Sequence, residues 1–251
     1  MSALVQLTDS ELHLYSRQIL LDAWDIDAQQ RLKKSRILIV GAGGIGCSSA
    51  ELLVRAGVGH VSLIDFDKIE TSNLQRQIAF EPQHLGQSKV QTLAARLASI
   101  NPHVELRAYD EQLDENWIKQ QPNHFDLVLD GCDNFATRYL VNTMCLTWQV
   151  ALLSAAAIAL QGQLLWLQGQ PCYQCVFPEF DVADERRCAT SGVLATVPTI
   201  MASLQAHHAL LYLGLARTPL KNKLLLWDGQ TMQQRILNLS ADPACPCCGA
   251  C

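Results

Sequence analysis

The first 160 residues alternate between short apolar runs and segments with helical periodicity. RILIV (36–40) is a continuous apolar run, which is typical of a strand buried on both faces of a sheet. It ends at GAGGIG, a helical pattern follows over 45–56, and HVSLIDF (60–66) predicts a second strand. A strand, a glycine turn, a helix and a strand in this order predict a βαβ unit with parallel strands.

The alternation continues and predicts a parallel sheet with helices on both faces. A capping box, TDSE, starts an N-terminal helix, and short apolar periodicities predict the next helices. After the first helix, further helices are expected over 28–34, 88–100, 114–120 and 134–149, and further strands over 104–109, 125–130 and 151–158.

The pattern changes after Gln161. QLLWLQ, KLLLWDG and QRILNL resemble strands without intervening short helices, so we expect them to extend the sheet in antiparallel fashion. The apolar stretch 192–215 contains Gln205 and two histidines and predicts a buried helix. The expected fold is therefore α/β, with a Rossmann-like, mostly parallel sheet extended by antiparallel strands. One domain is expected over 1–251, with a nucleotide-binding half (1–160) and a sheet extension (161–251).

Composition and charge exclude several classes of function. The net charge of -5 and the absence of a Lys/Arg run argue against nucleic-acid binding. The longest apolar run, 150–160, is too short to span a bilayer, and residues 1–11 lack the pattern of a signal peptide. We therefore expect a soluble, cytoplasmic protein without a membrane partner. Its ten cysteines should then be reduced, which favours metal binding or catalysis over disulfides.

A nucleotide site is predicted where the first strand meets its helix. Gly41, Gly43 and Gly46 match G-x-G-x-x-G, and Gly44 belongs to the same turn. Glycines let the backbone turn sharply and approach a phosphate at a helix N-terminus. Asp65, at the end of the second strand, can accept hydrogen bonds from ribose hydroxyls. The alternative is a tight turn without a ligand.

Charged residues beyond the turn suggest a triphosphate rather than a dinucleotide such as NAD or FAD. Asp67 is followed by a polar stretch with Asn73 and Arg76, and a guanidinium can hold phosphate with two hydrogen bonds. Lys89 begins a later helix and could meet the phosphates as well. Asp133 follows a strand at the ligand-binding edge and could hold Mg²⁺, cap the next helix, or do both. Taken singly, Arg76 and Lys89 could equally be surface charges.

Two C-x-x-C pairs, in PCYQC and CPCCG, predict a shared site. Cys172, Cys175, Cys245 and Cys248 could bind zinc as four thiolates, while a redox pair is the alternative for the first two. Cys247 could replace Cys248. If the pairs form a structural clamp, we expect it to lie away from the nucleotide chemistry.

Cys188 follows two arginines, in ERRC. Neighbouring positive charge favours the thiolate form of a cysteine. The side chain could therefore react, or it could be a loop thiol beside solvated arginines.

Motifs along nearly the whole chain resemble the MoeB/ThiF branch of the ubiquitin-activating-enzyme superfamily. They are YSRQILL, VGAGGIGC, AGVGHVSLIDFD, SNLQRQ, GQSKV, LVLDGCDN and the two cysteine pairs. The resemblance implies that ATP and Mg²⁺ activate the C-terminal glycine of a small ubiquitin-like sulfur-carrier protein. The products would be an acyl-adenylate and pyrophosphate. The motifs look like those of molybdopterin-synthase adenylyltransferases, so the first choice of carrier is the small subunit of molybdopterin synthase.

The resemblance also implies roles for single residues. Asp65 would hold the ribose and the glycines would let the nucleotide approach, with Asp67 at the same site. The phosphates would face Asn73, Arg76 and Lys89, and Asp133 would hold Mg²⁺. Arg17, in YSRQ, would act on the neighbouring subunit's site, which implies a homodimer. The four paired cysteines would hold a structural zinc, and a crossover loop would belong to 161–251.

Two alternatives remain open. The carrier could be that of the thiamine pathway, with Cys188 forming a covalent link to it. From the glycine turn alone, an NAD-linked oxidoreductase is possible, although it leaves SNLQRQ, Lys89 and the cysteine pairs unexplained. No rhodanese-like segment follows the second cysteine pair, so we expect sulfur to come from a separate sulfurtransferase.

Overall fold

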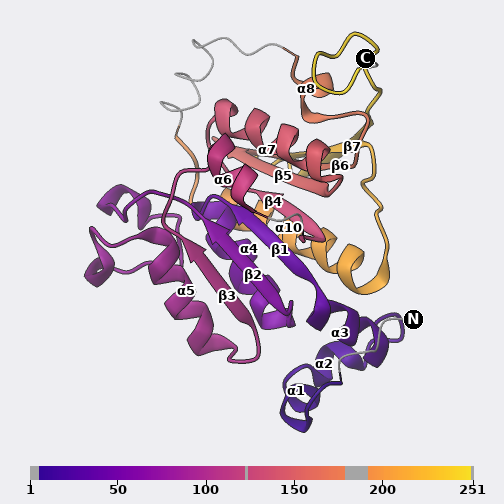
Figure 1. Cartoon of the computed structure of the whole chain (residues 1–251). Coiled ribbons are helices and arrows are strands. Elements are labelled where there is room, and N and C mark those ends of the chain that lie inside the picture. The colour runs from indigo at the N-terminus through magenta and orange to yellow at the C-terminus, as the bar shows by residue number, and fades with distance from the viewer. Residues whose placement is uncertain (1–5, 122–123, 179–191, 250–251) are drawn as a thin grey trace.

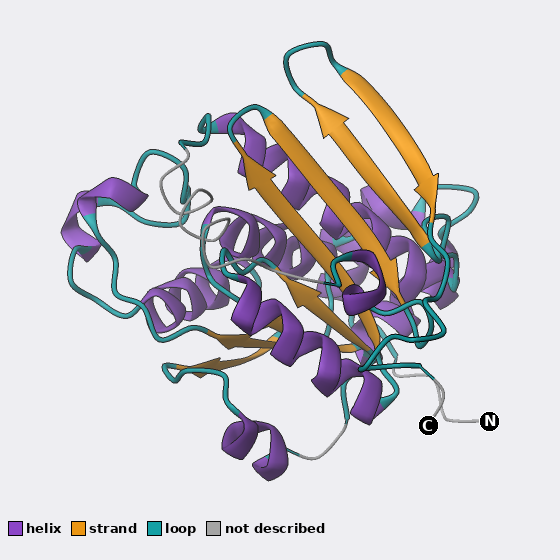
Figure 2. Cartoon of the chain, turned by 90° about the horizontal axis from the view of Figure 1, so that it is seen from above, coloured by secondary structure: helices purple, strands orange, loops and turns teal. Residues whose placement is uncertain are grey.

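Eight strands form one twisted sheet with helices on both faces (Figures 1 and 2). The computed structural model describes residues 6–121, 124–178 and 192–249. The strands are β1 (Arg36–Val40), β2 (His60–Ile64), β3 (Glu105–Tyr109), β4 (Leu127–Asp130), β5 (Ala151–Ile158), β6 (Gln161–Leu167), β7 (Lys223–Asp228) and β8 (Gln233–Asn238). Their order in the sheet is β3-β2-β1-β4-β5-β6-β7-β8.

The first five strands in this order are parallel, and the remaining pairs are antiparallel. The parallel strands β1, β2 and β4 are almost wholly buried, as their continuous apolar runs predict. In contrast, β8 at the open edge is exposed along its whole length. The structure thus confirms the predicted fold class.

The helices cover the two faces of the sheet and bury a separate apolar cluster on each. The helices are α1 (Asp9–Leu14), α2 (Ser16–Ile19), α3 (Asp25–Lys34), α4 (Gly44–Ala56), α5 (Lys89–Ile100), α6 (Glu115–Gln120), α7 (Phe135–Trp148), α8 (Tyr173–Val176) and α10 (Thr196–Leu215), with 3-10 turns η1 (Thr71–Asn73) and η2 (Pro82–His84). Residues of α3, α4, α5 and α10 fill one cluster, and residues of α6, α7 and α8 fill the other. None of the helices in the described ranges is long and apolar enough to cross a membrane.

The N-terminal helix differs from its prediction in one respect. The capping box forms as expected, with Thr8 accepting from the Glu11 amide and the Glu11 carboxylate accepting from the Thr8 amide at 2.8 Å. The helical segment is then divided at Tyr15 into α1 and α2. The Tyr15 ring is buried, and its hydroxyl accepts a hydrogen bond from Asn101 at 2.8 Å. The division therefore coincides with the residue that ties this hairpin to the core.

The predicted buried helix, α10, carries one fully buried amide that joins three elements. Gln205 Nε2 donates to the backbone oxygens of Asp130 and Leu153, each at 2.9 Å. Gln205 Oε1 accepts from the Ser49 hydroxyl at 2.7 Å. Because unpaired buried polar groups are costly, these bonds fix α10 against α4, the carboxyl end of β4 and the first half of β5.

We expect Gln205→Leu to lower the free energy of unfolding by about 2–4 kcal/mol, because it removes all three hydrogen bonds at a buried position. Urea unfolding followed by circular dichroism measures this change. The matched control is Ser203→Ala on the exposed side of the same helix, where the hydroxyl bonds only within the helix, to Thr199 O at 2.9 Å. Equal stabilities of the two variants would contradict the assignment.

Candidate functional site

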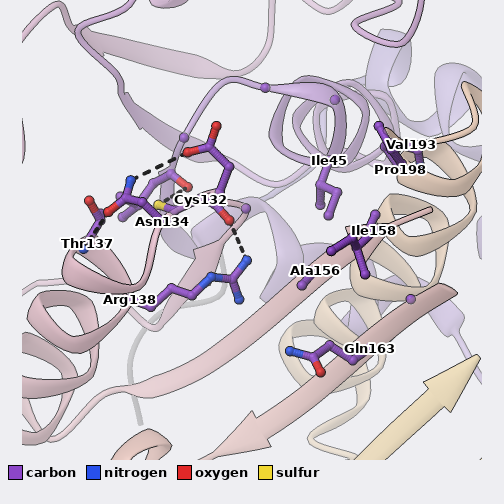
Figure 3. Close-up of a pocket in the computed structure, with 18 of the residues that line it drawn as sticks. Ile45, Cys132, Asn134, Thr137, Arg138, Ala156, Ile158, Gln163, Val193 and Pro198 are labelled. Carbon is purple, nitrogen blue, oxygen red and sulfur yellow. Dashed lines mark hydrogen bonds between the residues drawn. The ribbon is translucent and has the colours of Figure 1, made fainter. Parts of the chain in front are cut away.

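A cavity of about 860 Å³ lies at the carboxyl ends of the central parallel strands. Eight residues expected to bind nucleotide line it: Gly41, Gly43, Gly44, Asp65, Asp67, Arg76, Lys89 and Asp133. Figure 3 shows part of its wall, including Ile45 at the start of α4 and Asn134 at the start of α7. This is the edge at which open α/β sheets bind ligands.

The backbone of the turn requires glycine at two of its positions. Gly41 has φ of +91°, and a Cβ atom on Gly46 would lie 1.8 Å from the Gly41 carbonyl oxygen. Gly46 itself is not part of the cavity wall, so its contribution is to allow the turn to close. Helix α4 then begins at the cavity with Gly43 as its N-cap, and no side chain caps its first amides. A helix N-terminus in this state favours an anionic ligand.

Asp65 is fixed by the backbone on both sides. Its Oδ2 accepts from the Ala42 amide at 2.7 Å, and its Oδ1 accepts from the Asp67 amide at 2.8 Å. Burial raises the pKa of Asp65 above its ordinary value, although these two amides act in the opposite direction. The carboxylate is therefore held rigidly next to the glycine turn.

The two cations of the cavity are held differently. Lys89 is only 5% exposed, and its ammonium group lies 2.7 Å from an Asp67 carboxylate oxygen. Asp67 thus has a position beside the expected phosphate-binding lysine. Arg76 is half-buried and donates to the Ser72 carbonyl at 2.9 Å. Both cations face the cavity near the start of α4.

Asp133 is exposed in the loop after β4 and lines the cavity. The structure corrects one of its two expected roles, because Asn134 is the N-cap of α7 and accepts from the Thr137 amide at 2.8 Å. The Asp133 carboxylate has only a long contact, 3.5 Å, with the Asn134 side-chain amide. It is therefore available to a ligand.

Two other expected site residues, Asn73 and Arg17, are not in the cavity wall, and a third lies outside the described residues. Asn73 is buried and caps η1, with its Oδ1 accepting from the Glu70 amide at 3.1 Å. Arg17 is exposed on α2 and does not line the cavity of its own chain. Cys188 lies outside the described residues. The roles expected of these three residues stay predictions.

A buried ion pair behind the Asp133 loop was not anticipated from the sequence. Arg138 is 5% exposed and lies 3.5 Å from Asp130, which is 1% exposed. The guanidinium also donates to Cys132 O, to Ala155 O at 3.1 Å and to Ser154 Oγ at 3.2 Å. Figure 3 shows the bond from Arg138 to Cys132. Arg138 therefore fixes the Asp133 loop against β5. The available signal was Asp130, an acid at the end of an apolar strand.

The cavity continues as a trough over the antiparallel part of the sheet. Two cross-strand rows form its floor, Ala156–Gln163–Leu226–Arg235 and Ile158–Gln161–Asp228–Gln233. Cross-strand neighbours share one face of a sheet. The next row on this face includes Leu165 and Leu224, which pack in the cluster under α7 and α8. Helices thus cover the sheet only as far as the trough begins.

The four paired cysteines meet in one cluster, with all four sulfur atoms within 4.8 Å of one another. The Sγ atom of Cys172 lies 4.0 Å from that of Cys175 and 3.7 Å from that of Cys245. The Sγ atoms of Cys175 and Cys248 lie 3.3 Å apart. This arrangement could hold a metal ion. Cys247 points elsewhere, since its sulfur accepts from the Asn142 amide at 3.3 Å.

The cysteine cluster adjoins the cavity, although none of its four cysteines lines the wall. The expectation that it lies away from the nucleotide chemistry stays a prediction. Helix α8, which begins directly after Cys172 and contains Cys175, contributes Tyr173 to the cavity wall, and Phe177 lines it as well. The reason is topological, because β6 runs antiparallel to β5 and delivers the chain to α8 beside α7. The cluster and the cavity therefore share a wall.

Comparisons with known proteins place these features in a family. The ThiF family model matches residues 15–247. The molybdopterin-synthase adenylyltransferase of Escherichia coli K12 is 38% identical over 249 residues, covering 98% of this chain and 100% of the relative. The sulfur carrier protein ThiS adenylyltransferase of the same strain is 40% identical over 248 residues, covering 97% of each.

Solved structures agree in fold. Escherichia coli MccB with ATP superposes with a TM-score of 0.82 at 24% identity, over 96% of this chain and 75% of that one. Another MccB structure, with MccA-N7isoASN, gives a TM-score of 0.83 at 22% identity, over 97% and 76%. The family model and the two relatives confirm the resemblance found in the sequence, and the chain belongs to the ThiF family.

Proposed function

We propose that this protein is an ATP-dependent adenylyltransferase that activates the C-terminal glycine of a small ubiquitin-like sulfur-carrier protein. The observation that carries the proposal is the convergence of the glycine turn, Asp65, Arg76, Lys89 and Asp133 on one cavity. The relatives named as adenylyltransferases support the reaction class. Family membership argues against the NAD-linked alternative.

The geometry suits nucleotide binding at the parallel half of the cavity. Asp65 would accept from the ribose, and the triphosphate would lie against the N-terminus of α4 with Arg76 and Lys89 beside it. Asp133 is exposed and available, so its carboxylate fits a Mg²⁺ ion that would neutralise further phosphate charge. Catalysis of nucleotidyl transfer needs positioning and charge neutralisation more than a protein nucleophile.

The trough suits the other substrate. An extended glycine tail laid along Ala156 and Ile158 would bring its terminal carboxylate to the α-phosphorus. A carboxylate oxygen forms the new bond to phosphorus, the bond from the α-phosphorus to the bridging oxygen breaks, and pyrophosphate leaves.

Carrier-dependent exchange of pyrophosphate into ATP should therefore occur with purified protein. Lys89→Ala should lower the exchange rate at least about a hundredfold, because it removes the buried cation beside the phosphates. Lys68→Ala is the control, since Lys68 pairs with Asp110 at 2.8 Å, does not line the cavity and is half-exposed. The proposal fails if the wild-type protein exchanges nothing with any diglycine-tailed carrier.

Two carriers are candidates. The small subunit of molybdopterin synthase is our first choice, and the thiamine-pathway carrier ThiS, with Cys188 linking to it, is the second. The second is favoured by the relative named for ThiS, whose identity of 40% is close to the 38% of the molybdopterin-synthase relative. Running the exchange assay with each carrier, and with Cys188→Ala, separates the two.

We further propose a homodimer in which Arg17 reaches the phosphates of the other subunit's cavity. Its exposure, and its absence from its own cavity wall, support an action in trans. Arg17→Ala and Lys89→Ala should each be inactive alone. Co-expressed, they should recover about one quarter of wild-type activity, because half of randomly formed dimers carry one intact site. No recovery, with mixed dimers confirmed by mass spectrometry, would contradict action in trans.

The metal at the cysteine cluster is zinc in this proposal. At a Zn–S distance of about 2.3 Å, tetrahedral sulfurs lie about 3.8 Å apart, close to the spacing found here. One zinc per chain is therefore expected, and Cys248→Ser should lose it while Cys247→Ser keeps it. Metal analysis of purified protein checks this. Loss of zinc from the Cys247 variant alone would show that the wrong fourth ligand was chosen.

A further inference from the structure

Tyr173 lies both beside the cysteine cluster and in the wall of the cavity. It is the first residue after Cys172, so it belongs to the loop between two expected zinc ligands. Its ring is fully buried and packs against Phe177, with ring centroids 4.8 Å apart, and against Tyr139, at 5.9 Å. It also forms part of the cavity wall. A single residue therefore joins the cysteine cluster to the cavity.

The Tyr173 hydroxyl is buried beside the Arg138 guanidinium, which can only donate, and no acceptor for the hydroxyl proton lies within hydrogen-bond distance in the described structure. A buried donor without an acceptor is unfavourable, so it calls for an explanation such as a bound water or ligand. A tyrosine hydroxyl carries its proton at neutral pH and can donate it in a hydrogen bond.

Helix α8 is held in place at both ends. The Tyr173 amide donates to Asn142 Oδ1 at 2.8 Å, and the Tyr139 hydroxyl donates to the Phe177 carbonyl at 2.8 Å. The same Asn142 side chain donates to Cys247, between the second pair of cysteines. The position of Tyr173 thus depends on both halves of the cysteine cluster and on α7.

The location of Tyr173 favours one of the two substrates. Tyr173 packs in the same cluster as Leu165 and Leu224, which lie on the face of the sheet that forms the trough. The residues expected to hold ribose and phosphates follow β1 and β2 instead. A diglycine tail has no side chains, so it can be recognised only through its backbone, and a hydroxyl donor matches a glycine carbonyl.

We propose that the Tyr173 hydroxyl binds the backbone of the carrier's glycine tail, and that the zinc-binding cluster is the device that positions it. This inference rests on the proposed function. It makes the cluster a determinant of carrier binding, in addition to its effect on stability.

Tyr173→Phe tests the contact. Exchange is measured at saturating ATP with increasing concentrations of the molybdopterin-synthase small subunit, or of ThiS if only ThiS supports exchange. Loss of one neutral hydrogen bond should raise the KM for the carrier about three- to tenfold and leave the KM for ATP unchanged. The thermal midpoint of the substrate-free variant should change little, because Arg138 keeps Asp130 and the Cys132 and Ala155 carbonyls as partners. Metal analysis should still find one zinc per chain.

The matched control is Gln174→Ala, which lies between the same two cysteines but does not line the cavity. It should leave both KM values unchanged. An unchanged carrier KM in Tyr173→Phe would overturn the inference while wild-type exchange upholds the proposed function. A lower thermal midpoint with equal losses for both substrates would show a structural role only. Absence of wild-type exchange with either carrier would instead overturn the proposed function itself.

Cys175→Ser tests the positioning. This variant should lose zinc. Its KM for the carrier should rise by a larger factor than its dissociation constant for ATP, which calorimetry measures. Equal effects on both substrates would contradict a specific link between the cluster and the tail. If the variant does not fold, the comparison of Tyr173→Phe with Gln174→Ala decides alone.

Discussion

The cavity depends on one buried ion pair, between Arg138 and Asp130. Burial alone would lower the pKa of Arg138, but the Asp130 carboxylate outweighs this and keeps the guanidinium charged. A buried cation is tolerated only when its charge and its donors are satisfied. Here the donors are satisfied by the Cys132 and Ala155 carbonyls and by Ser154. Charge pairing in the core thus sets the position of the loop that carries Asp133.

The parallel and the antiparallel strands contribute different parts of the cavity. Parallel strands place short loops at one edge of the sheet, and those loops carry the charges that suit a nucleotide. Antiparallel strands continue the same sheet without helices over one face, which leaves an open floor for an extended chain. A reaction between a nucleotide and a polypeptide tail needs both surfaces to meet, and here they meet where β4 pairs with β5.

Much of this arrangement could be predicted from local patterns. The glycine turn, the acid after β2 and the apolar strands each have a signal within a few residues. Arg138 has no such signal, because an arginine in a predicted helix usually lies on its surface. The position of Tyr173 in the cavity wall could not be predicted for a similar reason, since a residue between two paired cysteines usually has no role beyond spacing them. In both cases the role depends on contacts between segments that are far apart in sequence, such as Asn142 with Tyr173.

The pairing of Lys89 with Asp67 affects which anions the cavity attracts. A buried ammonium group without a partner would draw in any small anion, and free phosphate is an obvious competitor. With a carboxylate 2.7 Å away, the lysine presents little net charge. An anion gains from Lys89 only if it can also compete with Asp67, which a multiply anchored triphosphate can do better than a small ion. The ion pair therefore weakens the attraction of Lys89 for small anions more than for a ligand with several contacts.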